Sequence, residues 1–427
     1  MRTLIIALVA ALSATVAQAD TIAVTNAHIH TMGTAGEIDN GTVVIRNGRI
    51  VAVGANAAVP KDARVIDAKG SLVTPGIFVT GTNIGVVEID LVPSTNDSAT
   101  KSPDISAAFD VQYGVDPNST VIPVARQAGV THALVTPGYS GDGERDLLFA
   151  GQAAVLSLAD GIEPVMRAKA AMMLELGEGG AARAGGARGA SILALKADLE
   201  DVRWFMRNRG NYNSGSARDL RLSRLDLQAL IPVVQGRMPL LVKVHRAADI
   251  RGVLKLAREE RLAIILAGAE EAWMVAADIA KARVPVLLAP QANLPDRFET
   301  LGASMENAAR LQEAGVTIAF SNGDGHRVRE VRYDAGNAVA HGLPYKAALA
   351  ALTINPARIF NVSGTTGSIE RGKSADLVIW TGDPLEPSTQ AQTVIIGGIE
   401  QPLDTRAQDL ARRYRDLNTT MPPAYKQ

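Results

Sequence analysis

The sequence predicts an α/β fold in which a (β/α)8 TIM-like barrel is inserted in a small β-sandwich formed by both chain ends. Near both ends, short alternating runs are broken by Asn-Gly and other glycine-containing turns, a pattern typical of hairpin strands. Between them, strand-like and helical segments alternate over about 290 residues, as in a wound parallel sheet. The length of 427 residues suits such a barrel with a satellite domain.

Each unit has expected boundaries. We expect a signal peptide over 1–19, a composite β-sandwich over 20–73 plus 368–403, a barrel over 74–367, and a C-terminal helix and tail over 404–427. In the sandwich, Asn47-Gly48 marks the clearest two-residue hairpin turn. The barrel strands are expected at 77–83, 130–137, 153–158, 239–245, 262–267, 284–290 and 316–322. The glycine- and alanine-rich stretch 177–189 is expected to be a loop.

An open doubly wound sheet is the alternative architecture, but no glycine-rich phosphate-binding loop follows any predicted strand. Composition restricts the classes of binding partner that are expected. Hydrophobic residues make up 47% of the chain, and 43 Lys and Arg nearly balance 44 Asp and Glu. Without a strong net charge, neither nucleic acid nor an anionic membrane is an expected partner, and a small molecule is. The chain has no cysteine, which excludes disulfides and thiolate ligands.

The first residues resemble a secretory signal. Arg2 supplies a positive charge, residues 4–12 form a short apolar run, and Ala17-Gln18-Ala19 is typical of a cleavage site before Asp20. A membrane anchor is the alternative, but the run is shorter than the roughly 20 residues of a spanning helix. We therefore expect a secreted protein, periplasmic, with no membrane contact after cleavage.

Both ends also resemble a known family. Residues 23–54 and 65–78 are similar to the amino-terminal sandwich of imidazolonepropionase-like amidohydrolases, and 348–386 to the closing helix and returning strands. Asn355-Pro356-Ala357 and the run 372–376 are the most specific parts. The resemblance implies a periplasmic amidohydrolase, a hydrolase acting on carbon-nitrogen bonds of amides, cyclic amides or dipeptides.

The resemblance also implies a catalytic metal bound by a His-x-His pair at the end of the first barrel strand. In PGIFVTGTNIG, the two histidine positions fall on Gly81 and Asn83, and the acidic position before them falls on Val79. Glycine has no ligand atom, and zinc prefers imidazole, thiolate or carboxylate to an amide oxygen. This strand is expected not to hold zinc in the usual way, so the metal site is predicted to be degenerate.

The other family positions are mixed. A bridging lysine corresponds to Ser157 and a sixth-strand histidine to Ala267, whereas His245 corresponds to the fifth-strand histidine. Asp324 corresponds to the catalytic aspartate, which would activate metal-bound water and then protonate the leaving nitrogen. His245 and Asp324 are thus the candidate metal ligands, and a turn aspartate and a hydrogen-bonded histidine are the structural alternatives.

Three further side chains complete the candidate pocket: Asn83, Lys243 and His326. A buried lysine needs a carboxylate partner, and we expect Lys243 to pair with Asp324 in place of the charge of a metal. A separate pair, His28 and His30, lies in the sandwich on one strand face, and we interpret it as a surface pair, with a metal site as the alternative. The polar stretch 88–114 is a candidate lid or a surface excursion.

Two functions follow. In the first, the chain is a hydrolase with a reduced site that holds at most one divalent metal, such as zinc, weakly. In the second, it is a non-catalytic pseudoenzyme that binds a small molecule or serves as an assembly partner. Three adequate ligands are the minimum for a catalytic zinc, and only two are found. By analogy with the family, a homo-oligomer or a hetero-oligomer with an intact amidohydrolase is expected.

Overall fold

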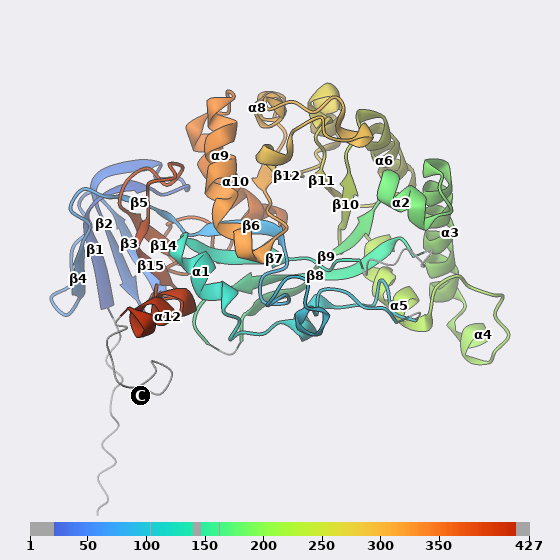
Figure 1. The fold of residues 1–427 in the computed structure, drawn as a ribbon, viewed down its shortest axis with the longest axis horizontal. Coiled ribbons are helices and arrows are strands. Elements are labelled where there is room, and N and C mark those ends of the chain that lie inside the picture. Colours follow the sequence, from blue (N-terminus) through green and yellow to red (C-terminus); the bar gives the residue numbers. More distant parts are fainter. Residues whose placement is uncertain (1–20, 103, 140–146, 162, 416–427) are drawn as a thin grey trace, which may run out of the picture.

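Two sheets organise the molecule. The structure is a computed structural model that describes residues 21–102, 104–139, 147–161 and 163–415. An eight-stranded sheet built from both chain ends lies at one side, and an eight-stranded barrel-like sheet with its helices forms the rest (Figure 1). The predicted fold class is therefore confirmed. The predicted signal peptide lies outside the described residues.

The sheet built from both ends, here called the chain-end sheet, runs in the order β16-β15-β14-β5-β1-β2-β3, with β4 paired to β1. Its strands are β1 Thr21–His30, β2 Glu37–Arg46, β3 Arg49–Gly54, β4 Arg64–Asp67, β5 Leu72–Pro75, β14 Leu377–Trp380, β15 Ala391–Ile396 and β16 Ile399–Glu400. The carboxy-terminal strand β14 pairs with β5 in antiparallel register. The return of the chain thus completes the sheet, as the two similar blocks of strands predict.

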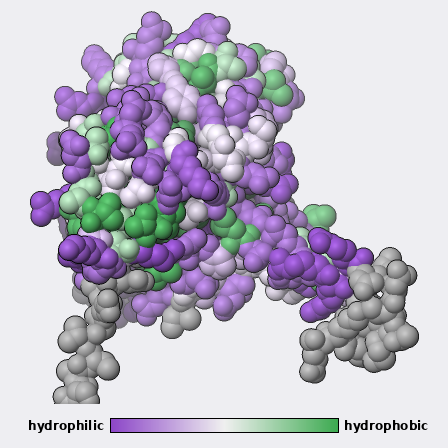
Figure 2. Space-filling view, turned by 90° about the vertical axis from the view of Figure 1, so that its left-hand side faces the viewer, coloured by the Kyte–Doolittle hydropathy of each residue, from purple (hydrophilic) through white to green (hydrophobic). Residues whose placement is uncertain are grey.

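Local sequence accounts for the hairpin between β2 and β3. Asn47 and Gly48 both have positive φ, 51° and 75°, as a type I′ turn requires. Behind the hairpin, Ile22, Val43 and Ile45 belong to a buried apolar cluster formed by this sheet and the segments next to its strands. On the outer face, hydrophilic side chains surround a smaller hydrophobic area (Figure 2), and the exposed apolar side chains of the sheet include Val65 and Ile399.

The barrel sheet runs in the order β13-β12-β11-β10-β9-β8-β7-β6. Its strands are β6 Ile77–Thr82, β7 Val130–Val135, β8 Phe149–Ser157, β9 Val165–Glu175, β10 Leu240–Val244, β11 Ile264–Gly268, β12 Val286–Leu288 and β13 Ile318–Phe320. First and last strands meet through a parallel bridge between Thr80 and Ser321, and the Thr80 hydroxyl donates to the Phe320 carbonyl over 2.8 Å. These contacts close the barrel.

One strand departs from the predicted pattern. β8 is antiparallel to both neighbours, β7 and β9, so these three strands form a meander, and the described residues between them contain no helix. The sequence prediction missed β9, because VMRAKAAMMLE is rich in residues with high helix propensity. Since β8 runs in reverse, Ser157 lies beside His132 near the amino ends of the parallel strands. The expected correspondence of Ser157 to a bridging lysine is therefore wrong, because such a lysine would have to lie at the opposite ends of the parallel strands.

Helices cover the barrel sheet (Figure 1). Their bounds are α1 Val121–Gln127, α2 Glu178–Arg183, α3 Arg188–Arg207, α4 Arg209–Asn213, α5 Arg224–Val234, α6 Ala247–Glu260, α7 Ala276–Ala282, α8 Asn307–Glu313, α9 Val331–Ala340, α10 Tyr345–Leu352, α11 Ile354–Ile359 and α12 Arg406–Tyr414. Short 3-10 helices are η1 Pro93–Thr95, η2 Val111–Gly114, η3 Ala272–Val275, η4 Pro290–Ala292, η5 Phe298–Thr300 and η6 Gly325–Glu330. The stretch 177–189, expected to be a loop, holds α2 and the start of α3.

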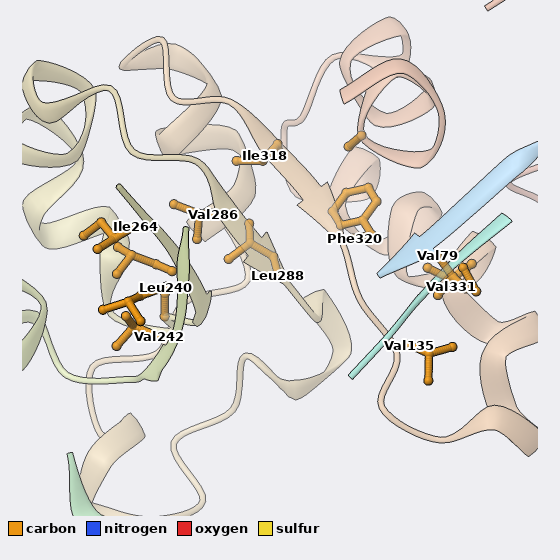
Figure 3. Packing of buried hydrophobic residues seen from close by; sticks show 14 of the residues in the cluster. Val79, Val135, Leu240, Val242, Ile264, Val286, Leu288, Ile318, Phe320 and Val331 are labelled. Carbon is orange, nitrogen blue, oxygen red and sulfur yellow. The ribbon is translucent and has the colours of Figure 1, made fainter. Parts of the chain in front are cut away.

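Alternation along the barrel strands separates two apolar layers. Phe78, Leu134, Leu241, Ile265 and Leu287 belong to one buried cluster, to which strands from around the barrel contribute and which fills the interior. Their strand neighbours belong to the larger cluster that also includes helix residues, part of which Figure 3 shows. The interior is thus packed, and only the strand ends are available for a site.

Two more segments bear on the sequence predictions. The polar stretch 88–114 is held to the start of α5, because the buried Asp226 carboxylate accepts hydrogen bonds from the backbone of Ser106 and Ala108.

In α12, Leu410 and Tyr414 remain exposed. Among the described residues, none of the helices combines the length and apolar character needed to cross a bilayer.

Candidate functional site

Five parallel strands from β9 to β13, together with β6, end at one edge of the barrel, here called the barrel mouth. Barrel active sites are built at this edge. Four candidate residues follow these strand ends: Asn83, His245, Asp324 and His326. Lys243 is the penultimate residue of β10. The contacts of these side chains differ from those expected.

Asn83 connects the first and last barrel strands. Its side-chain oxygen accepts a hydrogen bond from the backbone nitrogen of Gly325 over 2.6 Å. Gly81, two residues earlier, has φ 65°, which favours glycine over a side chain such as histidine. The two positions that correspond to the family's histidine pair therefore carry a backbone contact and a positive-φ glycine.

His245 forms a buried pair with Glu270. The Nδ1 atom lies 2.5 Å from Glu270 Oε2, and the two side chains are 4% and 6% exposed. Arg297 approaches the other carboxylate oxygen, with Nη2 3.8 Å from Oε1. A Cβ on Gly268 would come within 2.7 Å of the His245 ring, so glycine leaves space for it. Carboxylate and glycine together fix the orientation of this imidazole.

Glu270 is the residue that sequence reasoning missed. In the run LAGAEE, the resemblance aligns Ala267 with the sixth-strand histidine and gives no role to Glu270, three residues later. Because β11 ends at Gly268, Glu270 follows the strand directly and reaches across to His245. Two consecutive glutamates after a predicted barrel strand are the signal that could have identified it.

Lys243 pairs with Glu175, not with Asp324. The ammonium nitrogen lies 3.3 Å from Glu175 Oε1, and the lysine side chain is 43% exposed. The two residues are direct neighbours in the parallel register of β9 and β10. The expected pairing with Asp324 is therefore wrong, because the missed strand β9 brings a closer carboxylate to the lysine.

Asp324 caps the short helix η6. Its carboxylate accepts a hydrogen bond from the backbone nitrogen of His326 over 2.9 Å, as a turn aspartate does. His326 itself is exposed.

Burial acts to raise the pKa of Glu88. Hydrogen bonds from Ser119 and Thr120, together with the positive charge of His326, outweigh burial, so the pKa of Glu88 is lowered.

A second buried acid lies behind the mouth. Asp334 on α9 accepts a hydrogen bond from the backbone nitrogen of Gln291 over 3.1 Å. Burial, the largest cause, raises the pKa of Asp334 to about 7, and the neighbouring Glu330 adds to the effect. The side chain therefore exchanges a proton near neutral pH, a property that its place in the sequence does not reveal.

These residues do not fit the metal that the family implies. Within the described part of the chain, no three His, Asp or Glu side chains of the barrel mouth converge closely enough to hold one ion. With Nδ1 of His245 beside Glu270, this ring can offer one ligand atom, Nε2, and Glu175 is engaged by Lys243. A catalytic zinc requires three protein ligands. The described residues that do converge, His28, His30 and Glu37, lie in the chain-end sheet.

Comparisons with known proteins agree with the fold. Residues 242–401 match the model of the amidohydrolase family. The chain is 25% identical over 394 residues to "Amidohydrolase tasK" of Hapsidospora irregularis, a match that covers 84% of this chain and 40% of that protein. It is also 48% identical over 63 residues to a 5'-deoxyadenosine deaminase of Methanosarcina acetivorans, 14% of either chain. This chain thus spans about two fifths of the length of the first relative.

Solved structures show the same architecture. An amidohydrolase from Thermotoga maritima MSB8 superposes with a TM-score of 0.78 at 24% identity, over 89% of this chain and 99% of that chain. A molinate hydrolase superposes with a TM-score of 0.53 at 17% identity, over 90% and 95% of the two chains. At these identities the likeness establishes the fold.

Proposed function

We propose that this chain, which matches the amidohydrolase family over residues 242–401, is a non-catalytic relative that retains the barrel mouth as a binding site for a small molecule. The observation that carries the proposal is that, among the described residues, no group of three ligand side chains converges at the mouth around His245. A lone imidazole and a capping aspartate do not activate water as a bound metal does.

Charged pairs take the place that ligands hold in a metal site. Lys243 with Glu175, and Arg297 with Glu270, position cations beside carboxylates at the ends of β9, β10 and the loop after β12. Such pairs stabilise a polar mouth without an ion, and they present fixed donors to a ligand. We infer that the ligand is a small polar molecule with at least one anionic or carbonyl oxygen, which the partly exposed Lys243 and Arg297 would contact.

A second candidate is hydrolysis of a carbon-nitrogen bond. It is favoured by the orientation of His245: when Nδ1–H donates to Glu270, the Nε2 lone pair is available as a general base. In that case water loses a proton to Nε2 and its oxygen attacks the amide carbonyl. The imidazolium then returns that proton to the leaving nitrogen as the carbon-nitrogen bond breaks. The similar proteins named amidohydrolase, deaminase and hydrolase support this candidate only through their sequence or structural similarity to the chain.

One experiment separates the two. The purified mature protein, with and without added zinc, is incubated with a panel of amides, cyclic amides and dipeptides, beside His245→Ala and Glu270→Gln. The proposal predicts turnover no higher than that of His245→Ala on every substrate. Turnover that both variants abolish, while their melting curves keep a single folded transition, would establish the hydrolase instead.

We also propose the setting in which the protein acts. The signal-like sequence before Asp20 supports a periplasmic location, and a non-catalytic barrel would be retained as the partner of an intact amidohydrolase. Fractionation of cells that express the full chain, with mass spectrometry of the mature amino terminus, tests the first part. Size-exclusion chromatography with light scattering, alone and with an intact family member from the same cells, tests the second.

A further inference from the structure

Two histidines and two acids face one another on the chain-end sheet. His28 and His30 alternate along β1, which places both rings on one face of the strand. On the antiparallel neighbour β2, Glu37 is the direct register partner of His30, and Asp39 follows two residues later on the same face. The hairpin therefore brings four potential ligand or partner side chains together.

The distances resemble those of a built metal site. The Nε2 atoms of His28 and His30 are 3.2 Å apart, and the ring planes are nearly perpendicular, at 77°. Two nitrogens bound to one tetrahedral zinc at about 2.05 Å lie about 3.3 Å from each other. The ligand atoms of His28, His30 and Glu37 all fall within 4.8 Å of one another. One ion can therefore contact all three side chains.

An acid lies near the other nitrogen of each imidazole. Asp39 Oδ1 lies 2.5 Å from His28 Nδ1, close enough to hold the proton there and leave the Nε2 lone pair for a metal, as in carboxylate-histidine-metal arrangements. Glu37 Oε1 lies 3.6 Å from His30 Nδ1, beyond hydrogen-bond distance, so the ring does not hold this carboxylate and it can serve as a ligand.

Burial distinguishes this cluster from an ordinary surface pair. His30 is only 9% exposed, so the expectation of a surface pair is wrong for this ring. Its cover is Tyr345 of α10, whose ring centre lies 6.0 Å away and whose hydroxyl donates to Asp383. His28 stays partly exposed, which leaves an entry path for an ion.

We propose that His28, His30 and Glu37 form a binding site for a divalent transition metal of the zinc class, separate from the barrel mouth. The two imidazoles bind through Nε2, and the partly exposed Glu37 carboxylate supplies the third ligand. Water completes the shell on the side open to solvent. Imidazole with carboxylate suits zinc, nickel or copper better than calcium or magnesium. The site fastens β1 to β2 beside α10, where the two parts of the fold meet.

Zinc titration of the full mature chain, stripped of metal by a chelator, tests this site. Isothermal titration calorimetry should report one zinc per chain. His28→Gln, in the partly exposed ring, should weaken zinc binding at least about tenfold without unfolding the protein. Asp39→Asn, which alters only the partner of His28, should weaken it by about tenfold. Cobalt in place of zinc should give a visible absorption spectrum that His28→Gln abolishes.

Matched controls locate the ion. His341→Ala removes a histidine whose Nδ1 contacts the Asn337 carbonyl of its own helix, and it should leave zinc binding unchanged. His245→Ala tests the barrel mouth and should also leave it unchanged. Zinc binding that survives His28→Gln, or no binding at millimolar zinc, would overturn the proposal and leave the two rings sharing a proton. Zinc lost in His245→Ala would overturn both this site and the non-catalytic assignment of the mouth.

Discussion

Two histidine sites in this molecule share one feature, a carboxylate 2.5 Å from Nδ1, and differ in what else converges on the ring. At the barrel mouth, Glu270 is the partner of the buried His245, and among the described residues no group of three ligand side chains converges there. In the chain-end sheet, Asp39 is the partner of His28, and His28, His30 and Glu37 converge. The comparison teaches that position at a family's catalytic edge does not make a metal site, whereas convergence of ligand atoms does.

The largest loss of stability that a single substitution is expected to cause comes from breaking the buried pair at the mouth. Glu270→Ala leaves His245 without its partner in a closed environment and should lower the unfolding free energy by about 3 kcal/mol. Glu270→Gln retains an acceptor and should cost less, about 1 kcal/mol. Urea denaturation measures both. As a control, His326→Ala at the exposed end of the mouth should change stability by less than about 0.5 kcal/mol. Equal losses in Glu270→Ala and His326→Ala would mean that the pair is not structural.

Metal binding at the chain-end sheet should raise stability by nearly as much. Free zinc at 100 times its dissociation constant stabilises a folded protein by about 2.7 kcal/mol, if the unfolded chain binds none. The melting temperature of the wild type should therefore rise with zinc, and that of His28→Gln should not. A rise of the same size in both proteins would show that zinc acts elsewhere.

Asp334 extends the comparison of the two histidine sites to a buried carboxylate that is not paired with a histidine. Its pKa is about 7 in the folded protein and near 3.8 in the unfolded chain, so the native state holds a proton that the unfolded state has released. Stability should therefore fall as pH rises from 4 to 7, by up to about 1.4 kcal/mol per pH unit.

Asp334→Asn keeps the acceptor for the Gln291 backbone and removes the proton exchange, so the variant should gain stability over the wild type above pH 7. Asp278→Asn on the exposed face of α7 is the matched control. Chemical denaturation of the three proteins at pH 5, 6, 7 and 8 gives the comparison. If the wild type and Asp334→Asn share one slope against pH, the acid is already ionised when folded.

The smallest effect is expected at Lys243. Its pair with Glu175 is partly open to water, and exposed ion pairs contribute about 0–1 kcal/mol. Lys243→Ala should therefore melt within a few degrees of the wild type, yet it should weaken binding of an anionic ligand at the mouth. A large loss of stability would mean that the lysine replaces the charge of a metal structurally, as the sequence first suggests.

Much of the fold can be predicted from local sequence patterns. The turn at Asn47-Gly48 follows from dipeptide chemistry, and the alternation of apolar strands with helices predicts the barrel without knowledge of its contacts. The strand β9 was not foreseen, because its alanines and methionines favour helix and only pairing with β8 and β10 makes it a strand. Tertiary pairing overrides local propensity there.

The contacts within the site are harder to predict from sequence, because they also depend on tertiary pairing. Side chains at strand ends can be placed at the mouth, but their partners depend on the register between strands that are distant in sequence. Glu175 meets Lys243 only through β9, and Glu270 meets His245 only because β10 and β11 are neighbours. In the chain-end sheet, the alternation of His28 and His30 is visible in sequence, whereas the cover that Tyr345 supplies over His30 comes from more than 300 residues away.

Anomalous diffraction at the zinc absorption edge, from crystals of the mature chain grown with one equivalent of zinc, tests the central comparison most directly. The account predicts one strong peak between the rings of His28 and His30, close to Glu37, and no peak at the barrel mouth. A peak bounded by His245 and Asp324, with none in the chain-end sheet, would contradict it.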